Sequence, residues 1–418
     1  MELINKNKKV LSIILVASLI FARSNLGITV NKWVLLINVF VNALGLVFCG
    51  LMFVQDKKQI KKGLLNLAVA WAVIFSALVF VYGHFKIGTL SDFYSRQFAI
   101  MTVVPAVVIM MILFTNENDV IEILANAGSV IIFTTLVTSL LYDDVWKEWT
   151  NGTISDSRVG ATPAGSCVDT ANMMIILLIP IIYQLYFKKE IKKYILPLIL
   201  GVFQIFASGS KAAIIPLGIV FVIMIVSAAK DKKTLRRNII ILAVLAAIGT
   251  VVVMTVPLFY RIIGSRFIEL FTGLGSDEYD LHTSTGQRMA VAAEFKKHFG
   301  ETPLFGHGFY AFKEMAYSQL EEYKINGVIH YRHLQIHNNF MELLFSYGIV
   351  GFVLYYWFPV YLAVKSFMSK NKQVIVLTLS FLVSFFFIDL GLDMYYKYML
   401  PYFTYFVIYV IYKTGRDN

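Results

Sequence analysis

Long apolar runs recur along the whole chain and constrain its fold more than any other feature. Each run is close to the ~20 residues that a helix needs to cross the hydrocarbon core of a bilayer. The runs are continuous and do not alternate with polar residues, so they exclude a membrane β-barrel. The chain has 58% hydrophobic and only 15% charged residues, too little charge to cover a soluble surface. We therefore expect an all-α polytopic membrane protein.

Twelve of these runs are candidate spans, and the charges between them predict an orientation. The spans cover about residues 10–23, 33–54, 64–82, 98–114, 120–141, 171–187, 194–208, 212–228, 238–258, 338–364, 374–390 and 396–412. Lysine pairs such as Lys57-Lys58 and Lys188-Lys189 fall in alternate loops, which the positive-inside rule places in the cytoplasm. Both termini are then cytoplasmic. These loops account for most of the net charge of +11, so it does not indicate nucleic-acid binding.

Two predicted outward loops are long, and they divide the chain into three regions. Residues 1–258 would form a bundle of nine spans with an outward loop at 142–170. Residues 259–335 would form a large extracytoplasmic loop, and residues 336–418 would hold three further spans and a cytoplasmic tail. Long loops without a domain of their own are usually functional, so we expect the site in these two loops.

The large loop contains the signature of an amphipathic helix. Its apolar stripe has helical spacing and consists of Met289, Ala292, Phe295 and Phe299. Ser284 or Thr285 can cap its start, and Gly300 can end it. We expect this helix to lie on the membrane surface or to roof the bundle.

Three short motifs follow one another from this loop into the tenth span. The first is Pro303-Leu-Phe-Gly306-His-Gly308, and the second is His337-Asn338 at the point where the chain re-enters the membrane. The third is Gly348-Ile-Val-Gly351, whose small residues would allow close helix packing.

Together these motifs resemble the O-antigen polymerase and O-antigen ligase superfamily of bacterial envelope enzymes. The resemblance includes Arg288 in the amphipathic segment and Ser157-Arg158-Val-Gly160 in the other long loop. It also includes Ser208-Gly-Ser-Lys211 at an outward helix junction, where members of the superfamily usually carry Arg in place of Lys211. The large loop before the tenth span fits the same pattern.

The resemblance implies a glycosyltransferase with a GT-C-like helical fold in the bacterial cytoplasmic membrane, its active site facing outward. The donor would be a glycan on undecaprenyl diphosphate, and the acceptor a lipid-linked or other glycan. The enzyme would need no metal and no other cofactor. It would contact membrane lipids but no nucleic acid, with a flippase and a chain-length regulator as candidate protein partners.

The chemistry of such a donor makes two demands on the side chains. A sugar hydroxyl needs a general base, and histidine suits neutral pH. His337 is our candidate base, and Asn338 would orient it or bind sugar, with Gly348 and Gly351 in support. Four other histidines are alternatives: His330 and His333 are competing bases, and His84 and His307 could line the site.

The diphosphate leaving group is dense in negative charge and needs cations, among which arginine offers a planar fork. The candidate diphosphate ligands are Arg158, Lys211 and Arg288. Arg261 and Arg266 lie just past the ninth span and could bind diphosphate or lipid headgroups. The opposing interpretation is that these cations belong to solvated loops and helix faces.

Three functions stay open from the sequence. A polymerase would transfer a growing glycan to a lipid-linked repeat unit, whereas a ligase would move a finished glycan to another acceptor. A flippase or transporter of lipid-linked sugars would place charges in mid-span. Prolines interrupt the spans at Pro105, Pro180, Pro197 and Pro216, which keeps the transporter open. Asp389 and Asp393 flank the last outward turn, where we expect solvated carboxylates.

Overall fold

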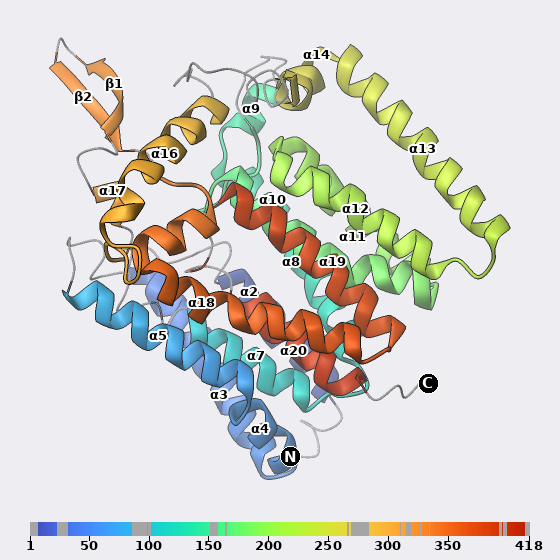
Figure 1. The fold of residues 1–418 in the computed structure, drawn as a ribbon. Helices are drawn as coiled ribbons and strands as arrows, with labels where there is room; N and C mark the ends of the chain where they lie inside the picture. Colours follow the sequence, from blue (N-terminus) through green and yellow to red (C-terminus); the bar gives the residue numbers. More distant parts are fainter. Residues whose placement is uncertain are drawn as a thin grey trace.

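The apolar runs of the sequence become helices that pack side by side in one bundle (Figure 1). The structure is a computed structural model, and it describes residues 7–22, 32–85, 98, 102–150, 158–163, 165–265, 267–268, 284–309, 311–314, 319–325, 328–333, 335–392, 395 and 399–413. Among these residues, nine helical segments are long and apolar enough to cross a membrane. They are α3 (Lys32–Phe53), α4 and α5 together (Lys57–Leu64 and Leu67–Phe85), α8 (Val120–Tyr142), α10 with η3 (Cys167–Tyr183 and Gln184–Lys188), α11 (Ile191–Ser208), α12 (Lys211–Ala228), α13 (Lys232–Thr255), α18 (Asn339–Met368) and α19 (Lys372–Gly391).

The other three predicted spans correspond to shorter helices. They are α2 (Lys8–Phe21), α7 (Val104–Phe114) and α20 (Leu400–Tyr412). The multi-pass helical architecture is therefore confirmed by helix length and hydropathy, and nine of the twelve predicted spans have full spanning length. The GT-C-like arrangement of these helices stays a prediction.

Apolar side chains cover much of the outer surface of the bundle. The helix α13 is the extreme case, because no residue of its apolar stretch is buried within the chain. Its Ile240, Ile248 and Val251 are each at least half exposed. Such a surface is costly in water but fits the hydrocarbon of a bilayer, so these helices have the exterior of a membrane protein.

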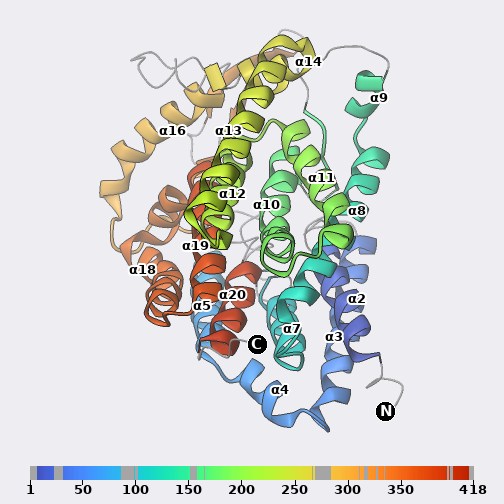
Figure 2. The same ribbon diagram turned by 90° about the vertical axis from the view of Figure 1, so that its right-hand side faces the viewer.

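The connecting elements gather at one end of the bundle. In both views α14 and α16 lie at this end and α4 lies at the other (Figures 1 and 2). The connecting elements are α9 (Val145–Thr150), α14 (Pro257–Phe259), η4 (Tyr260–Gly264), α16 (Ser284–His298), η5 (Phe299–Glu301), α17 (Ala311–Glu314), β1 (Gln319–Ile325) and β2 (Val328–His333). The two strands pair antiparallel, with Tyr323 opposite His330, and form a hairpin that the sequence did not predict.

Lysine and carboxylate side chains form ion pairs at the opposite end of the bundle. Lys62 pairs with Glu117 at 3.2 Å, and Lys193 pairs with Glu122 at 3.0 Å. These contacts join the start of α8 to α4 and to the start of α11. The lysines of α4 and of the start of α11 belong to loops that the charge rule assigns to the cytoplasm. The long loops lie at the other end, as the predicted orientation requires; the orientation itself stays a prediction.

The buried side chain of Trp71 replaces a hydrogen bond that Pro359 removes from α18. Pro359 has no N–H, so the carbonyl of Tyr355 four residues earlier loses its helical hydrogen bond. The indole nitrogen of Trp71, from α5, donates to this carbonyl at 3.0 Å. The Trp71 ring also stacks on Phe358, with 4.7 Å between ring centroids. An unsatisfied carbonyl is costly in a membrane, so this contact holds α5 against α18.

Candidate functional site

The end of the bundle at which α14 and α16 lie is called the outer end, after its predicted side. The helix α18 is broken in the half nearer this end, and the segment 303–308 fills the break. Gly348 has φ 64° and ψ −167°, which no helix can contain. The N–H groups of Ile349 and Val350 donate instead to the carbonyls of Pro303 and Leu304, at 2.9 and 3.1 Å. The large loop thus supplies the acceptors for two N–H groups that would otherwise donate within the helix.

The carbonyls on the other side of the break are satisfied in the same way. Phe345 accepts a hydrogen bond from the backbone N–H of His307 at 2.8 Å, and Ser346 accepts one from Gly308 at 2.9 Å. Because four hydrogen bonds join the two segments, the large loop is attached directly to the outer half of α18.

Two glycines make this close approach possible. A Cβ atom on Gly306 would lie 2.5 Å from the carbonyl carbon of Ser346, and one on Gly348 would collide with the backbone of Leu304. Both glycines also have positive φ. Gly348 therefore admits a loop rather than the neighbouring helix that we expected. Gly351 instead makes room for Tyr347 of its own helix and for Leu78 of α5.

The predicted amphipathic helix exists as α16 and packs on this part of α18. It starts at Ser284, one of the two residues predicted to cap it, and ends at His298, two residues before the predicted stop at Gly300. One 3₁₀ turn that contains Gly300 follows it. Its most buried residues are Ala290 and Val291, so the buried face is rotated from the predicted stripe. Phe295 belongs to both faces and lies 6.2 Å from Phe345 of α18.

His337 immediately precedes the capping residue of α18 and has an unusual backbone. Its φ is 50°, in the left-handed region that residues other than glycine seldom adopt. Asn338 is the N-cap, and its side-chain oxygen accepts from the N–H of Met341 at 3.0 Å. The His337 side chain is half-buried, with Nδ1 shielded from solvent. The backbone thus holds this imidazole at the point where the loop becomes a helix.

The outer end of α19 joins two of the predicted site segments. The last carbonyls of a helix have no partner within it. Here the guanidinium of Arg288 donates to the carbonyl of Gly391 at 3.2 Å. The amide of Asn338 reaches the carbonyl of Leu390 at 3.5 Å, which is a weak contact. Arg288 from α16 and the residue next to His337 therefore meet at one helix end.

The same helix end lies against the start of α12. A Cβ atom on Gly391 would lie 3.0 Å from the Cβ atom of Ala212, so the two helices approach closely. Ala212 follows Lys211, the first residue of α12. Lys211 is half-buried beside this contact. Lys211 therefore lies next to the end of α19 that Arg288 contacts.

The junction between α11 and α12 brings in two more cations. Gly209 has φ 59° and lies against the carbonyl of Ile262 in η4. The Cδ atom of Arg158 would lie 3.4 Å from a Cβ atom on Gly209. Arg261 directly precedes Ile262 and is exposed. The junction therefore gathers Arg158, Lys211 and the segment of Arg261, whereas Arg266 lies outside the described residues.

Asp143 positions the loop that carries Arg158, and sequence reasoning missed it. It follows α8 directly, and its carboxylate accepts hydrogen bonds from the N–H groups of Gly160 and Ala161, at 2.9 and 3.2 Å. The side chain is only 9% exposed. The available signal was an aspartate at the end of a span with no lysine or arginine close to it on the same helix.

A buried polar chain lies under the site and corrects one expectation. Asn339 donates to the hydroxyl of Tyr356 at 3.0 Å, and Tyr356 donates to Asp389 at 2.8 Å. The backbone N–H of Tyr395 donates to the side chain of Asn339 at 2.9 Å. Asp389 is 2% exposed, so it is not the solvated carboxylate that we expected. The predicted solvation of Asp389 was wrong because α12, α18 and α20 cover this residue, although hydropathy places it at the end of a span. Asp393 lies outside the described residues.

The other histidines have separate positions. His307 is buried, stacks on Phe345 at 4.3 Å, and its Nε2 contacts the carbonyl of His298, which is a packing role. The backbones of His330 and His333 belong to the hairpin that projects beside α16 in Figure 1. The side chain of His84 lies outside the described part of the chain.

The described residues contain no group of three or more His, Cys, Asp and Glu side chains that could hold a metal ion. The absence of a metal requirement stays a prediction. What the site does contain is an imidazole and several cations at one end of the bundle, and such a set suits an anionic substrate that needs a base.

Comparison with known proteins identifies the segment that contains most of this site. The O-antigen ligase family model matches residues 196–356. The match extends from α11 to the middle of α18 and includes Lys211, Arg288, His337 and the break at Gly348, but not Arg158. No curated protein matches the chain. The chain is therefore a multi-pass membrane protein by helix length and hydropathy, and its residues 196–356 match the O-antigen ligase family.

Proposed function

We propose that this protein is a polysaccharide polymerase. It transfers a glycan from undecaprenyl diphosphate to a sugar hydroxyl of a lipid-linked repeat unit, at the outer face of the bacterial cytoplasmic membrane. The observation that carries the proposal is the meeting at the outer end of α19, where Arg288, Asn338 beside His337 and Ala212 beside Lys211 come together.

His337 is the general base in this proposal. Its Nε2 takes the proton of the acceptor hydroxyl while the hydroxyl oxygen attacks the anomeric carbon. The bond from that carbon to the diphosphate oxygen breaks, and the electron pair leaves with the diphosphate. The left-handed backbone of His337 supports the role, because unusual conformations persist where the surrounding structure holds them in place.

Arg158, Lys211, Arg261 and Arg288 stabilise the leaving diphosphate, and Arg266 is a fifth candidate outside the described residues. Their charge counts most in the transition state, where negative charge grows on the leaving oxygen. Lys211 offers a single ammonium rather than a fork, so we assign bidentate binding to Arg288 or Arg158. Asn338 holds the start of α18 and so orients His337.

Two other functions use parts of the same arrangement. A ligase that moves finished glycan to another acceptor would need the same base and cations, and only the acceptor distinguishes it. A flippase is less well supported, because the candidate cations lie at one end of the bundle and not along its middle. A flippase and a chain-length regulator are the protein partners that a polymerase would need.

Reconstitution tests the proposal directly. The purified chain in proteoliposomes, supplied with a lipid-diphosphate-linked repeat unit, should produce longer glycan and release lipid diphosphate. His337→Ala should abolish both products, because a general base contributes about 10²–10⁴-fold. His307→Gln, which changes a histidine outside the proposed chemistry, should retain activity once matched for folded protein.

Three results would contradict parts of the proposal. Full turnover by His337→Ala would refute the base assignment. Glycan that crosses the membrane without elongation would identify a transporter. Loss of activity on chelation would refute the metal-free reaction.

A further inference from the structure

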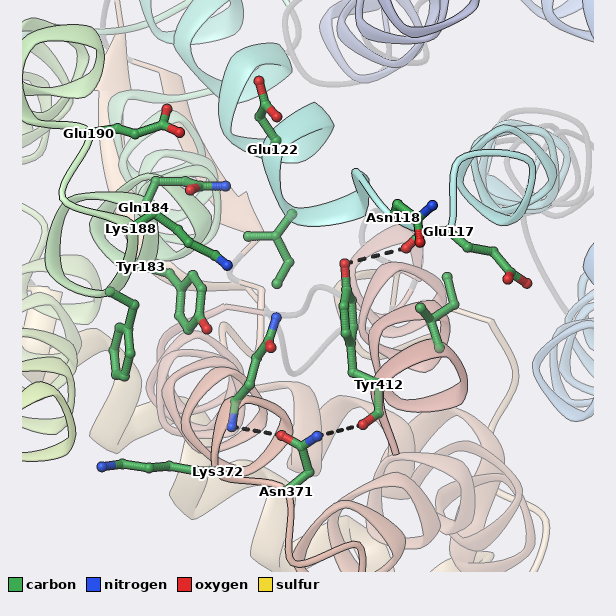
Figure 3. Close-up of a pocket in the computed structure, with 14 residues that line it drawn as sticks. Glu117, Asn118, Glu122, Tyr183, Gln184, Lys188, Glu190, Asn371, Lys372 and Tyr412 are labelled. Carbon is green, nitrogen blue, oxygen red and sulfur yellow. Dashed lines mark hydrogen bonds between the residues drawn. The ribbon is translucent and has the colours of Figure 1, made fainter. Parts of the chain in front are cut away.

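A polar cavity lies at the lysine-rich end of the bundle, away from the candidate site. Its volume is about 570 Å³. The starts of α8 and α19 line it, together with η3 and the end of α20 (Figure 3). Nothing in the proposed transfer reaction uses this cavity.

Hydrogen-bond donors point into the cavity. Lys188 and Gln184 extend toward its centre from η3 (Figure 3). Gln184 is only 4% exposed, yet its side-chain amide has no hydrogen bond to another described residue. An amide that lines a cavity without a protein partner can donate hydrogen bonds to a bound ligand.

The carboxylates of the cavity wall form ion pairs with lysines that do not line the cavity. Glu117 pairs with Lys62 at 3.2 Å, and Glu122 pairs with Lys9 at 2.6 Å and with Lys193 at 3.0 Å. Figure 3 shows Glu117 and Glu122 directed away from the centre. The third carboxylate, Glu190, lies 3.9 Å from the same Lys193, and the nearby Asp119 pairs with Lys9 at 2.9 Å.

The cations of the wall lack this compensation. Neither Lys188 nor Lys372 forms an ion pair with another of the residues that the structure describes. Two helices, α8 and α19, also begin at the cavity and direct the positive ends of their dipoles toward it. The cavity is therefore electropositive in spite of its three glutamates.

We propose that this cavity binds a phosphate group that carries a further substituent. Phosphate oxygens accept hydrogen bonds only, and they match a wall that presents an ammonium and an amide N–H. The volume exceeds what a bare phosphate fills. The rings of Tyr183 and Phe187, stacked at 4.6 Å, give the substituent a flat apolar wall. The source is either the headgroup of an anionic phospholipid or a soluble phosphorylated compound.

Thermal unfolding of the purified full-length chain tests the proposal and distinguishes the two sources. The soluble probe is inorganic phosphate, titrated against sodium chloride of equal ionic strength. The lipid probe is phosphatidylglycerol in nanodiscs, compared with phosphatidylcholine, whose choline neutralises the phosphate. Stabilisation by phosphate alone identifies a soluble ligand, and stabilisation by phosphatidylglycerol alone identifies a lipid headgroup.

Lys188→Ala should raise the half-maximal concentration of the active probe at least about tenfold, because it removes a charge-assisted hydrogen bond. Lys192→Ala is the matched control, since Lys192 is an exposed lysine close in sequence that does not line the cavity. Gln184→Leu is a second, uncharged test and should also weaken the response.

Two outcomes overturn the proposal. One is that neither probe stabilises the chain beyond its salt or lipid control. The other is that the Lys188→Ala and Lys192→Ala proteins respond at the same concentration; if Lys188→Ala does not fold, an unchanged response of Gln184→Leu decides in the same way. Binding is measured without glycan transfer, so the result does not depend on the proposed function.

Discussion

The guanidinium of Arg288 donates a hydrogen bond to the carbonyl oxygen of Gly391, with 3.2 Å between Nη2 and the oxygen. This contact joins the helix of the large loop to the outer end of α19. A guanidinium has five N–H donors in a planar fork, so one side chain can serve several acceptors at once. Arg288 can therefore close a helix end and present charge at once.

Arg288→Lys should lower turnover at least about tenfold, because one ammonium cannot hold the Gly391 carbonyl and also offer a bidentate fork to a diphosphate. Glycan length on gels and released lipid diphosphate measure the effect. Lys297→Ala is the control, because Lys297 is an exposed cation of the same helix that pairs with Glu294. Equal activity of Arg288→Lys and wild type would remove Arg288 from the site.

His337→Gly and His337→Ala should separate the backbone of this residue from its chemistry. Glycine adopts φ 50° without penalty, whereas alanine retains a left-handed strain of about 1–2 kcal/mol. We expect His337→Gly to unfold at the higher temperature of the two, and both proteins to be inactive. An active His337→Gly protein would show that the position matters for its backbone and not for its imidazole.

Gly348→Ala should be among the most destabilising substitutions in the outer half of the bundle. The new methyl group would collide with the backbone of Leu304, and a positive φ with ψ −167° is a conformation nearly confined to glycine. We expect a loss of more than about 2 kcal/mol in the free energy of unfolding.

Gly218→Ala in α12 is the matched control for this substitution, because nothing lies within 4 Å of its added Cβ atom. It should stay within about 1 kcal/mol of the wild type, on the stabilising side. Thermal unfolding in detergent compares the two. Similar unfolding temperatures for both variants would contradict the interlocked geometry.

Trp71→Phe and Pro359→Ala should partly compensate for each other. Trp71→Phe leaves the carbonyl of Tyr355 without its donor and should cost about 1–3 kcal/mol. Pro359→Ala supplies a helical N–H for that same carbonyl. The double variant should therefore lose less stability than the sum of the single variants, which a double-mutant cycle measures. Strict additivity would show that the indole hydrogen bond contributes nothing to stability.

Several features of the site followed from the sequence because each depends on local pattern. Residues 284–300 have the spacing of a helix, and they form α16 with its 3₁₀ turn. The motifs around Gly306, His337 and Gly348 all lie at one end of the bundle. These predictions held because helix formation and hydropathy are properties of consecutive residues.

Other features depend on residues that lie far apart in sequence. The segment at Leu304 fills the break at Gly348, although a Gly-x-x-Gly pattern in a span usually indicates helix packing. Asp389 is buried under Tyr356, and Asp143 holds the loop of Arg158, because neighbouring helices determine what each carboxylate meets. No local pattern distinguishes a solvated aspartate from a buried one.

The sequence by itself determined that the chain is a membrane protein of many helices with two long loops. The reason is that the free energy of transferring a helix into lipid is approximately the sum of the contributions of its residues. It also placed the lysines and the loops at alternate ends. Only the tertiary structure decided that α19 ends between Arg288, Asn338 and Ala212, and that a cavity lined by Lys188 and Lys372 opens at the other end. Those arrangements depend on how helices pack against one another, and packing follows from shape and hydrogen bonding across the whole bundle.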